Sequence, residues 1–435
     1  MQPTVAVDDL RPGMFIHMEG GWLSHPFPLS SFKLQSDDQI ATIRRLGLQR
    51  VRWSPEKSDA QVDPVPAATT SPGAPSSAPG PAAALNAAAQ QAAARRAQLD
   101  AQRAAQRQME AQYGEAGQTW RDATRLIGSD PAAAGAQVQA LAGAIVDKML
   151  SSQDVSIRLV PAGGERFATH LLNVTVVSLL LGRSLGLSAT DLNGLGTGTL
   201  LHDIGKLDLA ERVRHLEDGA TAAHIAAYRE HVARGLQQGQ RMALPPTAMA
   251  VIAQHHEQAD GQGFPLHLAG DKIHIAARIA AVVNRYDNLC NPPLRTVALT
   301  PHEAVAMLFA TGRNRFDPAV LNAFIKMMGV YPAGSVVQLT DDRFALVVGV
   351  NASRPLKPRV LVHDGGTPRG EALVLDLEQH PELGIRRSLA ASKLPPATLQ
   401  YLDPRPRTAY YFECLDTAAA ACEGGARAPA EPVAA

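Results

Sequence analysis

A histidine and an aspartate stand side by side at His202 and Asp203, directly after an apolar run, and Lys206 lies three residues after the aspartate. An imidazole and a carboxylate are ligands for a divalent metal ion, and a lysine ammonium beside them can neutralise a phosphate oxygen. The same three residues are also compatible with a partly buried ion pair at the end of a helix. The residues further along the chain are needed to distinguish the two interpretations.

Further histidines and polar residues occur at intervals of about one helix and its return. They are His231, the pair His255 and His256, the loop Asp260–Pro265 and the segment Asn284–Asp287. Ligands with this spacing come from different helices of a bundle and can converge inside it. Adjacent residues of a helix point about 100° apart. Two metal ions, or a kink at the helix end, would therefore explain why two histidines are adjacent.

Three of these segments, in this order, resemble the signatures of the HD-GYP family, a branch of the HD superfamily of metal-dependent phosphohydrolases. The family signatures HDIGK, HHE and DGxGYP read here as HDIGK at 202–206, HHE at 255–257 and DGQGFP at 260–265. The resemblance covers residues 140–328, and it is more specific than any one signature alone.

The resemblance implies a metal site built mainly from histidines. The expected ligands are His170, His202, Asp203, His231, His255, His256 and Asn284. Asp203 has two carboxylate oxygens and is the natural bridge between two ions. These residue types suit two divalent ions, with Fe or Mn as first choices and Zn, Co or Ni as alternatives. A third ion is not expected, because the position of an additional family glutamate is occupied by Arg166.

Other residues around the metals are expected to act on the substrate or to support the ligands. Asp203 and Lys206 are the predicted catalytic residues, and the predicted substrate-binding residues are Lys206, Gly261, Gly263 and Arg295. Glu257, Asp260, Arg278 and Asp287 are expected to support the metal ligands or the loop. A glycine-rich loop lets a backbone approach a ligand closely, and carboxylates commonly orient metal-binding histidines.

The chain departs from the family pattern at three places. Asn284 stands where the family has an aspartate, and an amide brings no negative charge. The segment Cys290–Arg295 replaces a family segment whose cations hold substrate phosphates, so that Arg295 is the remaining candidate. Phe264 stands where the family has a tyrosine. These changes put the substrate in question more than the fold.

The predicted fold class is mainly α, with an HD-type helical bundle core, a small α+β N-terminal domain and a small β-rich C-terminal domain. Apolar spacing predicts helical structure over residues 120–184 with a break at Pro161–Gly164, and a further helix from Ser188 to His202. Short strands are expected within residues 5–7, 15–18 and 51–53, and a helix over residues 37–46.

Composition predicts five segments along the chain. They are a small α+β domain at 1–57, a Pro/Ala-rich linker with an Ala/Gln-rich helix at 58–118, the HD-GYP domain at 119–330, a β-rich domain at 331–415 and a disordered tail at 416–435. The first resembles a small domain of unknown function that often precedes HD-GYP domains. The β-rich prediction rests on the runs 335–339, 344–350 and 359–362.

The bulk properties exclude several classes of protein. The chain has 435 residues and a formal net charge of +0, so binding to a nucleic-acid polymer is not expected. Its three cysteines form neither a disulfide framework nor a Cys-based zinc pattern. No signal peptide or membrane span is visible, and we expect a cytoplasmic protein.

The resemblance implies a metal-dependent phosphodiesterase that hydrolyses cyclic di-GMP to pGpG or GMP through a metal-bridging hydroxide, in bacterial signalling. One alternative is a weak or inactive HD-GYP module that binds nucleotide or partner proteins. Another is an HD-type hydrolase of a different phosphoester. Diguanylate cyclases or other signalling proteins bound through the Gly263–Pro265 loop, and a homodimer, stay open as partners.

Overall fold

The computed structural model describes residues 3–17, 31–34, 37–45, 48–58, 81–161, 166–215, 219–292 and 298–415. Contacts within the chain divide it into two compact units, residues 1–93 and 94–435. The predicted tail at 416–435 and residues 59–80 of the predicted linker lie outside the described residues.

The first unit is built on a four-stranded antiparallel sheet with one helix. Its strands are β1 (Thr4–Ala6), β2 (Phe15–His17), β3 (Ser31–Lys33) and β4 (Arg50–Trp53), in the order β1-β4-β2-β3, and its helix is α1 (Asp37–Arg45). Burial alternates along β4, where Val51 and Trp53 face the core and the two arginines face outward. The α+β character predicted from the short apolar runs is thus confirmed.

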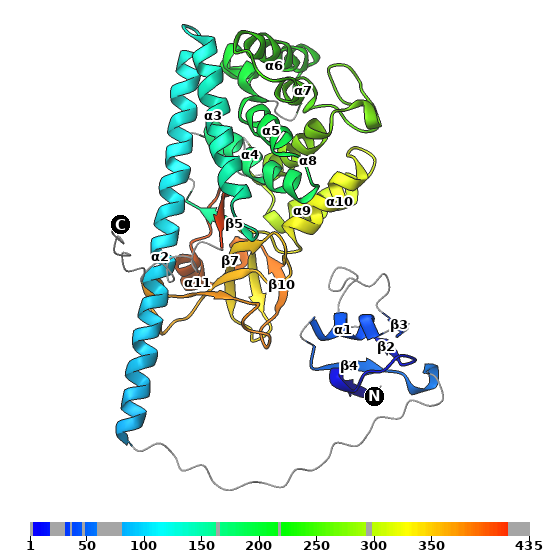
Figure 1. Cartoon of the computed structure of the whole chain (residues 1–435), viewed down its shortest axis with the longest axis vertical. Helices are drawn as coiled ribbons and strands as arrows, with labels where there is room; N and C mark the ends of the chain where they lie inside the picture. The colour runs from blue at the N-terminus through cyan, green and yellow to red at the C-terminus, as the bar shows by residue number, and fades with distance from the viewer. Residues whose placement is uncertain are drawn as a thin grey trace, which may run out of the picture. The chain divides into compact units, whose positions relative to one another are not determined.

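The second unit contains a bundle of helices (Figure 1), and the first of them, α2, begins at Pro81, within the residues of the first unit. Their bounds are α2 (Pro81–Leu126), α3 (Pro131–Leu150), α4 (Arg166–Ser184), α5 (Ala189–Leu201), α6 (Ala222–Arg241), α7 (Pro246–Gln254), α8 (Ile275–Cys290), α9 (Pro301–Thr311) and α10 (Pro318–Met328). Short 3-10 helices come after α5, at Ile204–Asp208 and Glu211–Val213. The predicted mainly α fold class is confirmed.

Helix α4 is the central helix of the bundle and contacts α5, α8 and α10 as well as the C-terminal strand. Among the described residues, it is the helix that is long and apolar enough to cross a membrane by length and composition. However, 78% of its apolar window is buried inside the protein. The apolar surface of α4 is therefore accounted for by packing against its neighbours.

A seven-stranded antiparallel sheet packs beside the bundle. Its strands are β5 (Val155–Val160), β6 (Val336–Leu339), β7 (Phe344–Asn351), β8 (Arg359–Val362), β9 (Val374–Asp376), β10 (Ile385–Leu389) and β11 (Ala409–Cys414). The order is β10-β6-β7-β5-β11, and β8 pairs with both β7 and β9. The short helix α11 (Pro396–Leu402) covers part of this sheet and buries Leu402 against it.

Strand β5 corrects the prediction that residues 120–184 are helical up to Pro161. Val155–Val160 pairs with β11 along its whole length and with the end of β7. The sheet therefore does not belong to the 331–415 segment alone. The pairing partners lie about 190–260 residues away in the chain, and local apolar spacing cannot distinguish such a buried strand from helix.

Helix α2 runs along the bundle and the sheet (Figure 1), and it is longer than the Ala/Gln-rich segment suggested. It continues to Leu126, so the domain boundary expected at residue 118 falls inside a helix. Its second half is anchored by Trp120, whose indole N–H donates to the Leu200 carbonyl at 2.9 Å and whose ring meets Phe167. Its first half is held to β9 by Gln102, whose amide exchanges two hydrogen bonds with the backbone of Val374.

We expect Trp120→Ala to lower the free energy of unfolding of the second unit by about 3–5 kcal/mol, because the substitution removes a buried aromatic side chain. The control is Glu115→Ala on the same helix, where the side chain is exposed and the expected change is within about 0.5 kcal/mol. Chemical denaturation followed by far-UV circular dichroism measures both. Equal effects of the two substitutions would contradict the anchoring of α2 on the bundle.

Candidate metal centre

Three of the candidate ligands are placed by helices in the same way. His202 comes directly after the last residue of α5, His255 directly after the last residue of α7, and His231 lies in α6. In each, the ring Nδ1 lies 2.5–3.0 Å from the backbone carbonyl oxygen three residues earlier, which belongs to Thr199, Ile252 and Tyr228 respectively. The helical backbone thus fixes the orientation of each imidazole.

These hydrogen bonds also decide the tautomer. A backbone carbonyl only accepts, so each Nδ1 carries the proton and donates it. The lone pair is then on Nε2, which points away from the helix and is available to a metal. His170, in the first turn of α4, is oriented in the same sense by a carboxylate, because its Nδ1 lies 2.6 Å from Asp287 Oδ2.

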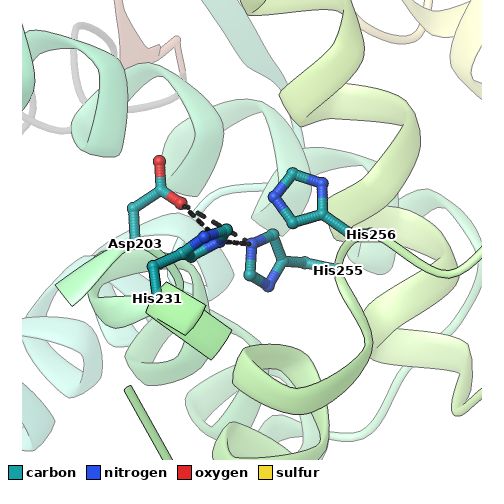
Figure 2. Close-up of side chains that lie close together, drawn as sticks. All are labelled: Asp203, His231, His255 and His256. Carbon is teal, nitrogen blue, oxygen red and sulfur yellow. Dashed lines mark hydrogen bonds and ion pairs between the residues drawn. The ribbon is translucent and has the colours of Figure 1, made fainter. Parts of the chain in front are cut away.

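The two oxygens of Asp203 face two different pairs of histidines. Oδ2 lies 3.7 Å from His170 Nε2 and 3.6 Å from His202 Nε2. Oδ1 lies 3.6 Å from Nε2 of both His231 and His255 (Figure 2). The carboxylate therefore belongs to two groups of candidate ligands, His170–His202–Asp203 and Asp203–His231–His255–His256.

The donor atoms fit a divalent metal ion. Two ligands bonded to one ion at about 2.0–2.2 Å lie roughly 3.0–3.5 Å apart, and His231 Nε2 and His255 Nε2 are separated by 3.3 Å. His202 Nε2, Asp203 Oδ1 and His256 Nε2 are buried atoms without a hydrogen-bond partner among the described residues. A buried polar atom without a partner is costly. A metal ion in the His170–His202–Asp203 group would satisfy His202 Nε2, and one in the other group would satisfy Asp203 Oδ1 and His256 Nε2.

The charge balance keeps Asp203 ionised. Burial alone would raise the pKa of this carboxyl group, but Lys206 and the surrounding histidines bring the pKa well below its usual value. Lys206 Nζ lies 2.6 Å from Asp203 Oδ2 and 5.0 Å from the centre of the Tyr228 ring. Burial would lower the pKa of Lys206, and the attraction of Asp203 outweighs this and raises it. The pair is thus a buried carboxylate with a buried ammonium.

His202, His231 and His256 are neutral at neutral pH. Burial lowers the pKa of His231 to about 4 and places the pKa of His202 and of His256 well below 6.5. Neutral imidazoles can bind a metal without first losing a proton. The arrangement thus combines one ionised carboxylate with neutral imidazole nitrogens on either side.

Asp287 is held in place by two asparagines that also bind the C-terminal strand. Asp287 Oδ1 accepts hydrogen bonds from the side-chain amides of Asn173 and Asn291 at 2.7 and 2.8 Å. Both amides donate in addition to the carbonyl of Thr408, at the entry to β11. The orientation of His170 is therefore connected to the start of β11 through Asp287.

Gly205, in the HDIGK segment, is required by the approach of α6. A Cβ at this position would lie 2.0 Å from the carbonyl oxygen of His231 and 2.5 Å from the nitrogen of Gly235. The backbone that carries Asp203 and the backbone that carries His231 are therefore packed against each other directly. No side chain fits between them, and this contact sets the distance between the two ligands.

The glycine-rich loop after the histidine pair is shaped by Glu257. Its carboxylate accepts from the backbone N–H of Leu266 and of Leu268 at 2.7 and 3.0 Å. Asp260 closes the turn by accepting from the Gln262 N–H. Both carboxylates therefore support the loop, and the groups of candidate ligands include neither of them.

The two loop glycines have a backbone role that differs from the substrate-binding role expected for them. Gly261 has a φ of +75°, which favours glycine. A Cβ on Gly263 would lie 2.4 Å from Glu257 Cα, so the loop folds back too tightly for any side chain. Among the described residues, the lining of the adjacent cavity includes Phe264 but neither glycine.

Phe264 faces into the protein, not toward solvent. Its ring stacks on His256 with the ring centres 4.4 Å apart, and the guanidinium of Arg229 lies 4.8 Å from its centre. The exposed apolar residue of this loop is Leu266, which is 65% exposed. A partner protein that binds this loop would therefore meet Leu266 first.

Two further candidates have side-chain partners of their own. Asn284 is buried in the wall of the cavity that His255 and His256 also line, and its Oδ1 accepts from the Asn288 amide at 2.6 Å. Arg278 pairs with Asp317 at 3.0 Å and binds the Ile273 carbonyl. Arg278 therefore joins α8 to the start of α10. It does not support the candidate ligands as expected, because it lies nine residues before Asp287 and so on the opposite face of α8. Arg295 lies outside the described residues.

The backbone after His202 decides where Lys206 points. If this segment were α-helical, Lys206, four residues after His202, would lie on the same face as His202. The α-helix instead ends at Leu201, and a 3-10 helix from Ile204 to Asp208 turns Lys206 onto Asp203 three residues earlier. Lys206 nevertheless lines the cavity, so that it faces both the carboxylate and the space for a substrate.

Sequence reasoning missed three residues that build the site. Asn173 and Tyr228 had no visible signal, because a buried asparagine in an apolar helix and a tyrosine before a histidine are common. Gly205 could have been recognised, since a glycine directly after a ligand pair indicates a close backbone approach.

Comparison with known proteins identifies two segments. A family model described as an HD domain matches residues 148–320, and one described as a domain of unknown function, DUF3391, matches residues 3–138. The second match extends well beyond the predicted 1–57 domain, through the linker and into α3.

The chain is similar to several curated phosphodiesterases. It is 28% identical over 375 residues to a cyclic di-GMP phosphodiesterase of Pseudomonas aeruginosa, a match that covers 83% of this chain and 85% of that protein. It is 29% identical over 161 residues to a cyclic di-GMP phosphodiesterase response regulator of Xanthomonas campestris, covering 37% and 43% of the two chains. A 3'3'-cGAMP-specific phosphodiesterase of Vibrio cholerae is 27% identical over 175 residues, covering 40% and 38%.

Among solved structures, an HDG"Y"P protein from Bdellovibrio bacteriovorus aligns with a TM-score of 0.41 and 14% identity, covering 74% of this chain and 98% of that one.

We expect Asp287→Asn to lower metal affinity about 10–100-fold while the protein stays folded, because the amide keeps the size of the side chain but loses the charge that orients His170. Metal titration followed by elemental analysis measures the effect. The control is Asp208→Asn, whose exposed carboxylate binds Gln238 away from the ligands. Unchanged affinity in Asp287→Asn would remove His170 from the set of ligands.

Gly205→Ala should lower the free energy of unfolding by about 1–3 kcal/mol and reduce the metal content, because the added methyl group pushes the His231 backbone away from Asp203. Gly114→Ala, at an open position of α2, is the matched control and should stabilise by about 0.5–1 kcal/mol. Thermal unfolding with and without added Mn²⁺ measures the stability of each variant and the gain in stability that the metal brings. Normal metal content in Gly205→Ala would show that this contact does not set the ligand spacing.

Proposed function

Because the chain belongs to the HD-GYP family of HD-domain phosphohydrolases, we propose that it is a metal-dependent phosphodiesterase whose substrate is a cyclic dinucleotide. The proposal rests on the position of Asp203, whose two oxygens face separate groups of histidine nitrogens beside a cavity of about 510 Å³. Cyclic di-GMP is the proposed substrate, with pGpG and then GMP as products, because several similar proteins are named as cyclic di-GMP phosphodiesterases.

Two divalent ions are proposed to share Asp203 as a common ligand. His170 and His202 would complete the ligands of one ion, and His231, His255 and His256 those of the other. Ions in such a site polarise a phosphoryl oxygen and lower the pKa of water that attacks phosphorus. Neutral imidazoles and a carboxylate, without cysteine, suit Fe or Mn and also accept Zn, Co or Ni.

The residues of the chain supply the remaining requirements. Lys206 keeps Asp203 ionised and presents its ammonium to the cavity, where it can offset negative charge on the phosphoryl oxygens. Tyr228 lies against the Lys206 ammonium and also lines the cavity. Burial raises the pKa of Tyr228, so its hydroxyl stays protonated and can donate a hydrogen bond to the substrate.

A second candidate function is a nucleotide-binding or partner-binding module with little turnover. It is favoured by Asn284, which replaces a carboxylate and already accepts a hydrogen bond from Asn288. A site that lacks this charge would bind one ion weakly. Docking of signalling proteins would then use the loop that exposes Leu266.

The deciding experiment is turnover of cyclic di-GMP under anaerobic conditions by the chain loaded with Fe(II) or Mn(II). We expect release of pGpG or GMP, loss of turnover by a factor of about 10³ or more in Asp203→Ala, and reversible loss on chelation. Product from Asp203→Ala at the wild-type rate would refute the role of the bridging carboxylate.

Asn284→Asp separates the two candidate functions. If the wild-type protein binds cyclic di-GMP without turnover and holds fewer than two ions, and Asn284→Asp gains both an ion and turnover, the module interpretation is supported. Turnover by the wild type with two bound ions would support the enzyme.

A further inference from the structure

The cavity beside the ligand groups is lined by more cationic side chains than carboxylates. It extends from His255 and His256 to the outer face of α8 and the segment between α9 and α10. Lys206, Arg214, Arg285 and Arg315 line it, and of the described lining residues only Glu257 is a carboxylate. Glu257 is already engaged with two backbone N–H groups of the loop, so it neutralises none of these cations by direct contact.

Two of the four cations have an ion-pair or hydrogen-bond partner. Lys206 pairs with Asp203. Arg214 donates from Nε to the Leu209 carbonyl and from Nη2 to the Leu207 carbonyl, at 3.0 and 3.2 Å. Arg285 and Arg315 differ, because within the described part of the chain neither side chain has an ion pair or a hydrogen bond.

Arg285 is placed by α8 next to the buried Asn284 and one turn before Leu289, and all three line the cavity. The side chains of Arg285 and Arg315 are both exposed, and both line this cavity. Two like charges in the same wall repel each other, and an anion between them would relieve that repulsion.

Arg315 comes from a segment with a fixed backbone. Its carbonyl accepts from the Ala259 N–H at 2.7 Å, and its own N–H donates to the Gly312 carbonyl at 3.0 Å. The first bond ties this segment to the residues just after His256 and Glu257. Arg315 is thus positioned relative to the metal ligands, although its side chain is exposed.

Arg313, two residues before Arg315, has different surroundings. Its guanidinium lies 4.8 Å from the centre of the Phe309 ring, and it is not among the residues that line the cavity. The two arginines that do line it face the same space as Lys206.

We propose that Arg285 and Arg315 form a binding site for the second phosphodiester of a cyclic dinucleotide, the one that is not hydrolysed. This inference rests on the proposed function. A cyclic dinucleotide carries two singly charged phosphodiesters; the ligand groups around Asp203 would take the reacting one, and the other requires cations within the same cavity. Guanidinium groups bind phosphate through two parallel hydrogen bonds. The site would supply cations in place of those of the family segment, of which Cys290–Arg295 retains Arg295 as a candidate.

The test compares Arg285→Ala, Arg315→Ala and the control Arg313→Ala, which removes the same charge from the same segment as Arg315→Ala. The metal-loaded full chain is assayed with cyclic di-GMP and with bis(p-nitrophenyl) phosphate, which has one phosphate. For cyclic di-GMP we expect KM to rise about tenfold in each cavity variant, as for a lost charge-assisted hydrogen bond, with kcat within about twofold. The ratio of kcat/KM between the two substrates should fall by the same factor, Arg285→Lys should recover part of it, and Arg313→Ala should match wild type.

Equilibrium binding of a hydrolysis-resistant phosphorothioate analogue of cyclic di-GMP to the same proteins separates this inference from the proposed function. Weaker binding in the two cavity variants supports the second-phosphate site even if the wild type shows no turnover. Turnover by the wild type with unchanged KM and unchanged analogue binding in the variants overturns the site and leaves the phosphodiesterase intact. An equal loss with both substrates also overturns it, because a general disturbance of the reacting centre would then explain the effect.

Discussion

The buried carboxylate of Asp203 is the constraint on which the rest of the bundle depends. It is 1% exposed and stays ionised, and a buried charge is tolerated only when it is paired and hydrogen-bonded. Lys206 provides the opposite charge, and four histidine nitrogens approach the two oxygens from two directions. Three of these imidazoles are oriented by helical backbone carbonyls, so the ends and turns of helices fix the geometry of the whole centre.

The packing of α6 against the 3-10 helix after Asp203 makes this geometry stiff. Because Gly205 brings two backbones into direct contact, Asp203 and His231 cannot move apart without separating the two elements. Burial lowers the pKa of His202 and of His231, so these two imidazoles are neutral at neutral pH and add no repulsion to this arrangement. Ligands that the fold holds in place reduce the cost of ordering them around an ion.

The C-terminal sheet takes part in the organisation of the centre. Asn173 and Asn291 connect Asp287, and through it His170, to the entry of β11, and β5 lies between β11 and β7. A change in the sheet would therefore be transmitted to one of the two ligand groups and not equally to the other. Together with Arg285 and Arg315 in the cavity wall, this makes the site asymmetric, with one side connected to the sheet and the other open to the substrate.

The sequence by itself predicted the type of site and indicated the family of this protein. The adjacent His202 and Asp203, the pair His255 and His256, and the glycine-rich loop are local patterns, and local patterns survive without knowledge of the fold. The strands β1, β2 and β4 of the N-terminal unit and the strands β6, β7 and β8 were also predicted from local runs of strand-forming residues, whereas β3, β9, β10 and β11 were not. Only the tertiary structure decided that Val155–Val160 is a strand, that Lys206 turns onto Asp203, that Arg278 belongs to another contact, and that Arg285 and Arg315 share one cavity wall. Each of these depends on the surrounding fold and not on apolar spacing, and contacts of that kind leave no periodic signal in the sequence.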